Sequence, residues 1–232
     1  MAMMVGFDLD MTLADTRAGI GAVYERLAAE TGVAIDVELV TSRLGPPLAV
    51  ELANWFPAGE VDAMVARYRE LYPAIAVPAS VTMPGAWDAI EAVRARGGRT
   101  MVVSAKNHRD TVATVEFLGL PVDVVRGGLW AAEKGIALRE HGAGLYVGDH
   151  PGDVDAARAA GAFSLTVATG GYSAAVLRDY GADAVLSELT AFPSWLRDNP
   201  IQPPSSPPSA DTATASSANT TTSTTSPSAI DT

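Results

Sequence analysis

The fold is decided by one stretch near the N-terminus, Val5-Gly6-Phe7-Asp8-Leu9-Asp10-Met11-Thr12-Leu13. The apolar run over residues 3–7 predicts a buried strand. Asp8 and Asp10 follow it, and two acids at the end of a buried strand cost free energy unless a partner compensates their charge. We expect a magnesium ion there, because magnesium prefers hard oxygen ligands. The alternative is a strand end at which the two acids simply reach water.

Beyond residue 84 the sequence alternates between short apolar runs and amphipathic segments. Strands are predicted for residues 100–104, 122–125, 144–148, 164–168 and 184–186, and helices for residues 86–96, 111–118, 134–141, 154–160 and 174–180. This alternation predicts an α/β fold with a Rossmann-like parallel sheet that helices cover on both faces. Ligands of such folds bind at the carboxyl ends of the strands, so polar residues there are candidates for a site.

The part between the first strand and residue 84 is different. It lacks a convincing strand and predicts helices at residues 14–31, 36–44, 48–56 and 61–71. We interpret residues 15–83 as an inserted helical domain, and residues 1–14 with 84–198 as the α/β core domain. Trp55, Phe56 and Tyr68 are expected in the core of the helical bundle. From residue 199 the composition changes to Pro, Ser, Thr and Ala, which predicts a disordered tail over residues 199–232.

The composition excludes several classes of function. The chain has 16 Lys and Arg against 27 Asp and Glu, a net charge of −11, which argues against nucleic acid or an anionic membrane as the main partner. It contains no cysteine, which excludes disulfides and thiol chemistry. The N-terminal residues are not typical of a signal peptide, and no apolar run is long enough to cross a bilayer. We therefore expect a cytoplasmic protein, either a monomer or a homodimer.

Polar side chains recur at the ends of the later strands and at helix starts. Ser104 ends one strand, Lys134 opens a helix, and Asp149 and Asp153 follow another strand. Serine often caps a following segment, and the two acids would also suit a helix N-cap and first turn. A lysine at a helix start is unfavourable for the helix dipole, which makes an anion-binding role more natural for Lys134. His150, next to Asp149, is expected in a loop exposed to solvent.

In this order, the motifs resemble those of the haloacid dehalogenase-like (HAD) hydrolase superfamily. They read Phe7-Asp8-Leu9-Asp10-Met11-Thr12-Leu13, Val102-Val103-Ser104, Glu133-Lys134-Gly135, and Val147-Gly148-Asp149 with Asp153. The resemblance covers about residues 3–190, and the helical insert is similar to the cap of the phosphoglycolate phosphatase-like group. Met11 stands where many members have glycine, and Gly135 where many have proline, but neither change removes a reacting group.

The resemblance implies a role for each motif residue. Asp8 would be the nucleophile that forms an aspartyl-phosphate, and Asp10 the general acid, with Thr12 fixing the turn that aims Asp10. The residues that would bind phosphate are Thr12, Ser104, Ala105 and Lys134. The residues that would hold Mg²⁺ are Asp8, Asp10 through its backbone carbonyl, Asp149, and Asp153 through water or as a support for its neighbours.

The reaction implied is the Mg²⁺-dependent hydrolysis of a small phosphorylated metabolite, phosphoglycolate-like or a sugar phosphate. Asp10 argues against carbon–halogen cleavage, because members with that activity lack the second aspartate. A phosphotransferase of the β-phosphoglucomutase type is the first alternative, and a non-catalytic binding protein on the same scaffold is the second. The candidates for substrate specificity are Arg43, Lys106 and Asn107. Arg43 equally fits a solvated helix residue, and the other two a helix N-terminus.

Overall fold

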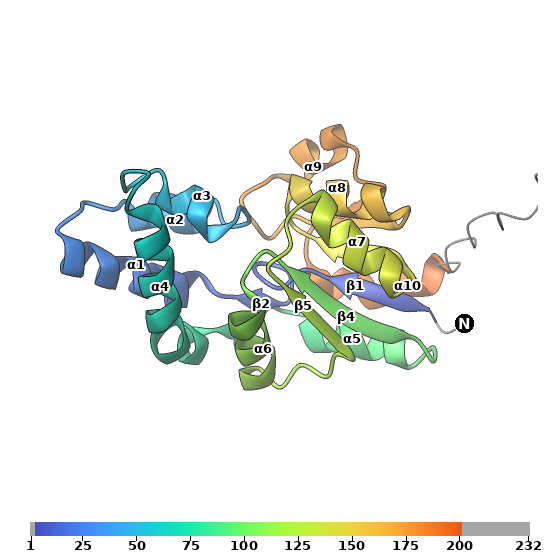
Figure 1. Cartoon of the computed structure of the whole chain (residues 1–232). Coiled ribbons are helices and arrows are strands. Elements are labelled where there is room, and N and C mark those ends of the chain that lie inside the picture. The colour runs from blue at the N-terminus through green and yellow to red at the C-terminus, as the bar shows by residue number, and fades with distance from the viewer. Residues whose placement is uncertain (1–2, 201–232) are drawn as a thin grey trace, which may run out of the picture.

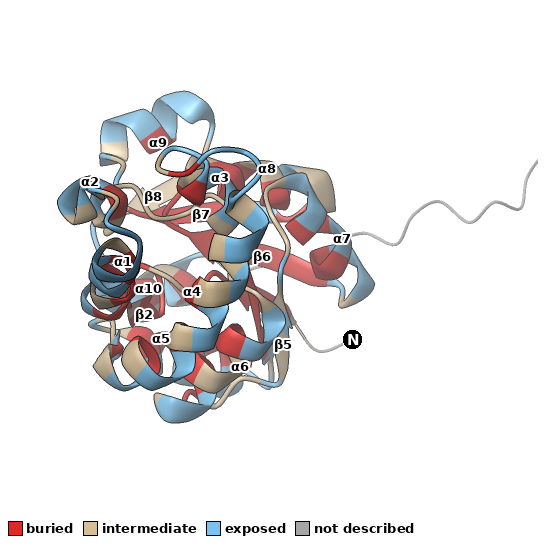
Figure 2. Ribbon diagram, turned by 60° about the vertical axis from the view of Figure 1, so that its left-hand side comes forward, coloured by how far each residue is buried: buried red, intermediate tan, exposed pale blue. Residues whose placement is uncertain are grey.

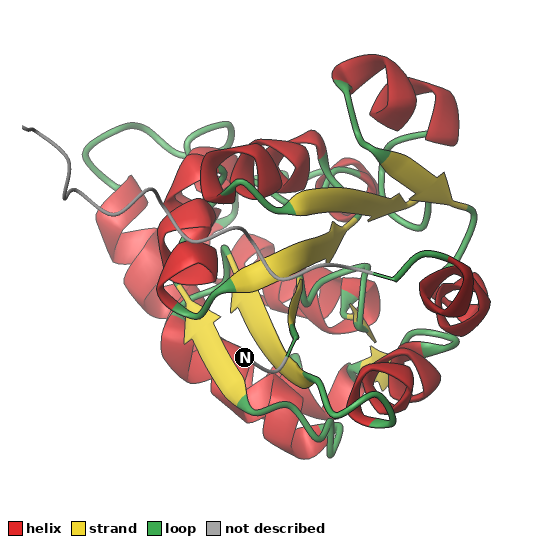
Figure 3. Ribbon diagram, turned by 90° about the vertical axis from the view of Figure 1, so that its right-hand side faces the viewer, coloured by secondary structure: helices red, strands yellow, loops and turns green. Residues whose placement is uncertain are grey.

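Strand β1 (Met4–Phe7), formed by the first apolar run, lies inside a six-stranded parallel sheet. The structure, a computed structural model, describes residues 3–200. The strand order is β5-β4-β1-β6-β7-β8, so β1 has a parallel neighbour on each side (Figure 3). The other strands of this sheet are β4 (Arg99–Ser104), β5 (Val124–Gly127), β6 (Ala143–Gly148), β7 (Phe163–Val167) and β8 (Ala184–Leu186). The α/β, Rossmann-like architecture predicted from the sequence is confirmed.

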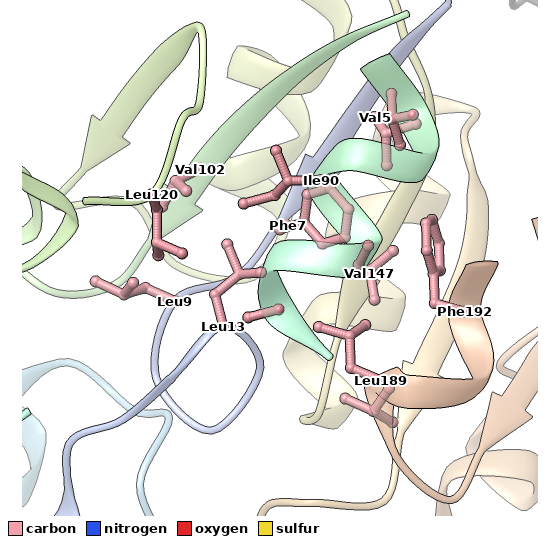
Figure 4. Packing of buried hydrophobic residues seen from close by; sticks show 14 of the residues in the cluster. Val5, Phe7, Leu9, Leu13, Ile90, Val102, Leu120, Val147, Leu189 and Phe192 are labelled. Carbon is pink, nitrogen blue, oxygen red and sulfur yellow. The ribbon is translucent and has the colours of Figure 1, made fainter. Parts of the chain in front are cut away.

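Helices cover both faces of this sheet. They are α5 (Ala86–Arg94), α6 (His108–Phe117), α7 (Ala132–Glu140), α8 (Pro151–Ala160), α9 (Ala174–Tyr180) and α10 (Phe192–Asp198), with a 3₁₀ turn η2 (Leu189–Ala191) before α10. On one face Phe7 and Val147 share a cluster with Ile90 of α5 and Phe192 of α10 (Figure 4). On the other face Tyr146 packs with residues of α7 and α8. Successive residues of a strand point to opposite faces of the sheet. A strand whose residues are apolar on both faces is therefore typical of a sheet that is covered on both sides.

A separate group of helices lies to one side of the sheet (Figure 1). It consists of α1 (Arg17–Thr31), α2 (Val37–Ser42), α3 (Leu48–Leu52), α4 (Val61–Ile75) and the 3₁₀ turn η1 (Val77–Ala79), and we call it the helical unit. The helical unit has a hydrophobic cluster of its own, in which Phe56 and Tyr68 are buried and against which Trp55 packs. The inward faces of its helices are buried and the outer faces exposed (Figure 2). The expected bundle core is therefore present.

Helix α4 runs further than the sequence predicted. The sequence predicts a helix over residues 61–71, yet the helix continues to Ile75 through Pro73, which lacks an N–H. The carbonyl of Arg69 loses its helical donor at Pro73, and the guanidinium of Arg109 from α6 donates to it instead. The hydrogen bond from Arg109 thus gives the Arg69 carbonyl a donor in place of the N–H that Pro73 lacks.

The expectation that residues 15–83 contain no strand is wrong in one detail. Strands β2 (Ala14–Asp15) and β3 (Val81–Thr82) pair antiparallel where the chain enters and leaves the helical unit. Two residues are too few to show a periodic pattern, so this pairing has no signal in the sequence. It also delays the start of the first helix from residue 14 to Arg17.

Two further expectations concern the ends of the chain and membranes. The tail predicted from residue 199 lies almost wholly in residues 201–232, outside the described residues. Within residues 3–200, the structure shows no helix with the length and apolar character that crossing a membrane requires.

Gly19 of α1 lies close to the backbone of Ala76, which gives a first prediction. A Cβ at Gly19 would lie 2.5 Å from the carbonyl oxygen of Ala76, which is backbone and cannot swing away. We expect Gly19→Ala to destabilise the protein by about 1–3 kcal/mol, as overpacking does, with a lower urea midpoint. Gly59→Ala is the matched control, because a Cβ at Gly59 meets nothing within 4 Å. Equal midpoints for the two variants would contradict the prediction.

Candidate active site

The register of the sheet brings the predicted strand-end residues together. Phe7 of β1 pairs with Val102 of β4 and with Val147 of β6, so these three strands end at the same edge. The backbone N–H of Asp8 donates to the carbonyl of Val147 at 2.8 Å, which extends the ladder by one residue. Ser104 ends β4 at this edge and is buried.

Three carboxylates meet beyond the ends of β1 and β6. Asp8, Asp149 and Asp153 are buried, and each offers an oxygen within 4.8 Å of the others. The ammonium of Lys134 lies 3.0 Å from Asp8 Oδ1 and 2.7 Å from Asp153 Oδ1, and it is 1% exposed. One buried cation therefore faces three buried acids, and the cluster has an excess of negative charge. The sequence placed all four residues at this edge.

The electrostatics of the cluster follow from this imbalance. Burial raises the pKa of Asp8 from its usual 3.8 to about 7, although Lys134 acts to lower it. Burial and the neighbouring Asp153 raise the pKa of Asp149 well above its usual range. Burial alone would lower the pKa of Lys134, but Asp153 and Asp8 raise it above its usual value. Lys134 stays charged, while Asp8 and Asp149 lack the nearby positive charge that would keep their pKa values low.

The cluster fits a divalent cation such as Mg²⁺. Asp8 Oδ1 is buried and accepts no hydrogen bond from the described residues, since its contact with Lys134 lacks hydrogen-bond geometry. Asp153 has both oxygens occupied, by Lys134 and by the N–H of His150. Asp149 uses Oδ1 to accept from Thr12 at 3.0 Å. Asp8 and the second oxygen of Asp149 are therefore free to act as ligands, while Asp153 suits a supporting position.

Asp10 lies apart from this cluster and has different partners. The hydroxyl of Thr16 donates to Asp10 Oδ1 at 2.6 Å, and the ammonium of Lys106 pairs with the same oxygen. The sequence suggested that Thr12 fixes the turn that aims Asp10. The Thr12 N–H donates to the Leu9 carbonyl at 3.3 Å within that turn, while the hydroxyl donates to Asp149 rather than to Asp10. Met11 has a φ of 59°, a left-handed turn that carries the next residue back towards β6. Nothing in the sequence marked Thr16.

The specificity candidates occupy different positions. The side chain of Lys106 is 7% exposed, contacts Asp10 and lies 5.1 Å from the centre of the Tyr72 ring in α4. Asn107 is the N-cap of α6, where its side-chain oxygen accepts from Asp110 N at 3.1 Å. Arg43 holds Glu51 through two hydrogen bonds of 3.0 and 2.8 Å, so its guanidinium is engaged within the helical unit. Of these three residues, only Lys106 contacts Asp10, the candidate general acid.

A cavity of about 310 Å³, which we call the chamber, lies between the helical unit and the sheet edge. Asp10, Ala105 and Lys106 line it from the core, and Arg43 and Tyr68 line it from the helical unit. The general-acid candidate therefore faces a space large enough for a small molecule.

The expectation for His150 is wrong. The residue is 8% exposed, and its Nδ1 accepts from Gly152 N at 2.9 Å as the N-cap of α8. Its ring packs edge-on against Trp130 and Tyr172, at centroid distances of 5.1 and 4.8 Å. The sequence did contain a local signal, a capping box completed by Asp153, but the aromatic neighbours come from distant segments.

The loop after β7 is a part of the site that sequence reasoning missed. Thr169 donates to the carbonyl of Met11 at 2.5 Å, and a Cβ on Gly170 would lie 1.8 Å from Asp149 Oδ2. Only glycine leaves room for that carboxylate. The paired glycines Gly170 and Gly171 after a strand were the one available sign.

The charge excess predicts how Mg²⁺ affects stability. Between about pH 4 and about pH 7 the unfolded chain releases the Asp8 proton while the folded chain keeps it, so the metal-free protein loses stability as pH rises. Mg²⁺ at 100 times its Kd should restore about 2.7 kcal/mol, or about 5–10 °C in Tm. Thermal melts at pH 5 and pH 8, with Mg²⁺ or EDTA, measure this. A Tm that Mg²⁺ leaves unchanged at pH 8 would contradict the prediction, and Asp149→Asn should weaken the effect.

Comparisons with known proteins agree with this geometry. The family model of haloacid dehalogenase-like hydrolases matches residues 5–158, and a second model of HAD-hydrolase-like proteins matches residues 131–192. The chain is 31% identical over 221 residues to the phosphoglycolate phosphatase of Rhodospirillum rubrum, covering 84% of this chain and 91% of that protein.

Two solved structures show the same fold. One is a haloacid dehalogenase-like family hydrolase from Streptococcus pneumoniae, with a TM-score of 0.75 and 22% identity, covering 84% of this chain and 98% of that one. The other, from Thermotoga maritima, is described as a β-phosphoglucomutase, with a TM-score of 0.65 and 19% identity, covering 84% of this chain and 99% of that one. The family match runs from β1 into α8 and so includes every residue of the acidic cluster. This protein is therefore an enzyme of the haloacid dehalogenase-like hydrolase family.

Proposed function

We propose that this protein is a Mg²⁺-dependent phosphatase that hydrolyses a small phosphorylated metabolite through an aspartyl-phosphate on Asp8. The observation that carries the proposal is the position of Asp8, whose Oδ1 accepts no hydrogen bond from the described residues and lies beside Lys134 in an acidic cluster suited to a divalent cation. The similarity to the phosphoglycolate phosphatase of Rhodospirillum rubrum supports the reaction class.

The first step forms one bond and breaks another. Asp8 attacks phosphorus, a P–O bond to Asp8 forms, and the P–O bond to the leaving alcohol breaks. Asp10, placed beside the chamber, gives its proton to the leaving oxygen. Lys134 and Ser104 hold phosphoryl oxygens, and a bound Mg²⁺ would neutralise part of the phosphate charge.

The second step returns the enzyme to its starting state. Asp10 takes a proton from water, the oxygen of that water attacks phosphorus, and the bond to Asp8 breaks to release inorganic phosphate. In the structure Thr16 and Lys106 hold the carboxylate of Asp10 in one orientation. Both contacts are made to Oδ1, so the other oxygen, Oδ2, would carry the proton that is transferred in the two steps.

The helical unit acts in this proposal as a cap over the site. Residues 15–83 would form the cap domain, with residues 1–14 and 84–198 as the core domain. The paired β2 and β3 join the two, and the chamber lies between them. A cap that closes over bound substrate excludes water and adds specificity.

Phosphate release from a panel of phosphorylated metabolites, with Mg²⁺ and with EDTA, tests the proposal. We expect release that requires Mg²⁺, and a lack of release from every ester would contradict it. The second candidate is transfer of the phosphoryl group to an acceptor sugar, which the similarity to the structure from Thermotoga maritima favours. Phosphate that is retained on an added sugar, rather than released, would identify the transferase.

A further inference from the structure

The chamber has more space and more aromatic surface than a two-carbon substrate would use. Its volume of about 310 Å³ reaches the range of pockets that enclose ligands of drug size. Tyr24 and Tyr68 line it from the helical unit, and Trp130 lines it from the loop after β5. The two tyrosine rings lie 5.3 Å apart, and both are buried. Both parts of the protein therefore present aromatic surface to the same space.

The charges around the chamber do not favour a second anion on the substrate. Its charged lining residues are three cations and four acids, namely Arg43, Arg69, Lys106, Asp10, Glu51, Asp110 and Glu133. Glu51 holds Arg43, and Asp10 holds Lys106. Arg69 is exposed and forms no salt bridge within residues 3–200. Asp110 is itself paired with Arg109 at 2.8 Å. An anionic group deep in the chamber would thus find Arg43 and Lys106 already paired with acids.

We propose, on the basis of the phosphatase function above, that the substrate is a phosphate monoester whose leaving alcohol carries a flat, uncharged aromatic ring. The phosphate lies at Asp8, and the ring fills the chamber against Tyr24, Tyr68 and Trp130. Aromatic side chains stabilise such a ring through burial and through offset or edge-to-face contacts. An uncharged ring needs no ionic partner in the chamber, whereas a carboxylate would have to compete with Glu51 or Asp10 for a cation that each already holds.

Three phosphate esters test the proposal. Their leaving groups are all alkyl alcohols, so differences in rate should reflect binding in the chamber rather than the reactivity of the leaving group. The esters are benzyl phosphate, ethyl phosphate and phosphoglycolate, each assayed with Mg²⁺ for phosphate release. We expect kcat/KM for benzyl phosphate to exceed that for ethyl phosphate by about 100-fold, since even a single methylene in an apolar pocket changes it by about 10-fold or more. Phosphoglycolate should be no better than ethyl phosphate.

Variants of Trp130 test whether a preference for benzyl phosphate depends on a contact between its ring and this residue. Trp130→Ala should lower the ratio of kcat/KM for benzyl over ethyl phosphate by about tenfold, and Trp130→Phe should keep most of that ratio. The control is Trp87→Ala, because Trp87 lies on α5, is 44% exposed and does not line the chamber. If Trp130→Ala leaves the ratio of kcat/KM for benzyl over ethyl phosphate unchanged, the proposed position of the substrate ring against Trp130 is wrong.

The outcomes also separate this inference from the function on which it rests. Phosphoglycolate as the best ester, with a rate that falls in Arg69→Ala, would overturn the aromatic substrate and leave the phosphatase intact. Equal kcat/KM values for benzyl and ethyl phosphate would do the same. No release from any of the three esters, or from the wider panel of metabolites, would contradict the proposed function and this inference together.

Discussion

Replacing Asp8 by Asn is expected to lower kcat by about 10⁴-fold or more, because an amide cannot attack phosphorus to form the intermediate. Asn has nearly the shape of Asp, so the packing at the end of β1 is retained. Burial already disfavours the charged form of Asp8 and raises its pKa to about 7, so an uncharged side chain should not destabilise the fold. Activity and stability should therefore separate in this variant.

The measurement is phosphate release at saturating substrate and Mg²⁺, with a thermal melt of the same protein in EDTA, where the loss of a metal ligand does not affect Tm. Asp179→Asn is the matched control, since Asp179 is exposed on α9 and should leave both the rate and Tm unchanged. Release that survives in Asp8→Asn at a tenth of the parent rate would reject Asp8 as the nucleophile. A loss of activity with a collapsed Tm would instead indicate a structural role.

Replacing Lys134 by Met is expected to cost the metal-free protein about 3–5 kcal/mol, the usual penalty for leaving buried charges without a partner. Met fills a similar volume, so the effect comes from charge rather than from a cavity. Lys134 is 1% exposed and contacts both Asp8 and Asp153, so both acids lose their nearby cation together. The destabilisation should grow above pH 7, where Asp8 must ionise, because burial raises its pKa to about 7.

A double-mutant cycle distinguishes this explanation from poor packing. Lys134→Met combined with Asp153→Asn removes the cation and one of its acids, so it should recover part of the lost stability. Urea unfolding at pH 8 in EDTA measures the cycle. If the double variant is less stable than Lys134→Met by the full cost of Asp153→Asn, the two side chains do not interact and the explanation fails.

The placement of the acidic cluster could be predicted from the sequence for a simple reason. Asp8, Ser104 and Asp149 each follow an apolar run that is buried on both faces, and parallel strands end at one edge of a sheet. The identity of the residues at that edge is therefore set by short-range patterns. The helices of the inserted segment follow in the same way from their periodic apolar positions.

The hydrogen-bond partners of these residues could not be predicted from the sequence. Thr12 contacts Asp149, which lies 137 residues away, while Thr16 rather than Thr12 holds Asp10. The direction of each side chain depends on the left-handed turn at Met11 and on which distant loop fills the space opposite. No spacing rule along the chain carries that information, because it arises only when segments far apart in sequence pack together.

Three other features also depend on contacts between segments that are far apart in the sequence. Arg109 allows α4 to pass through Pro73, aromatic rings from two other segments bury His150, and Gly170 leaves room for Asp149. In each case a local pattern permits several outcomes and a tertiary contact selects one. The sequence alone thus determined the α/β fold, its inserted helices and the residues at the sheet edge. Only the tertiary structure decided the orientation of the acids and the shape and charge of the chamber, because these depend on long-range packing and burial.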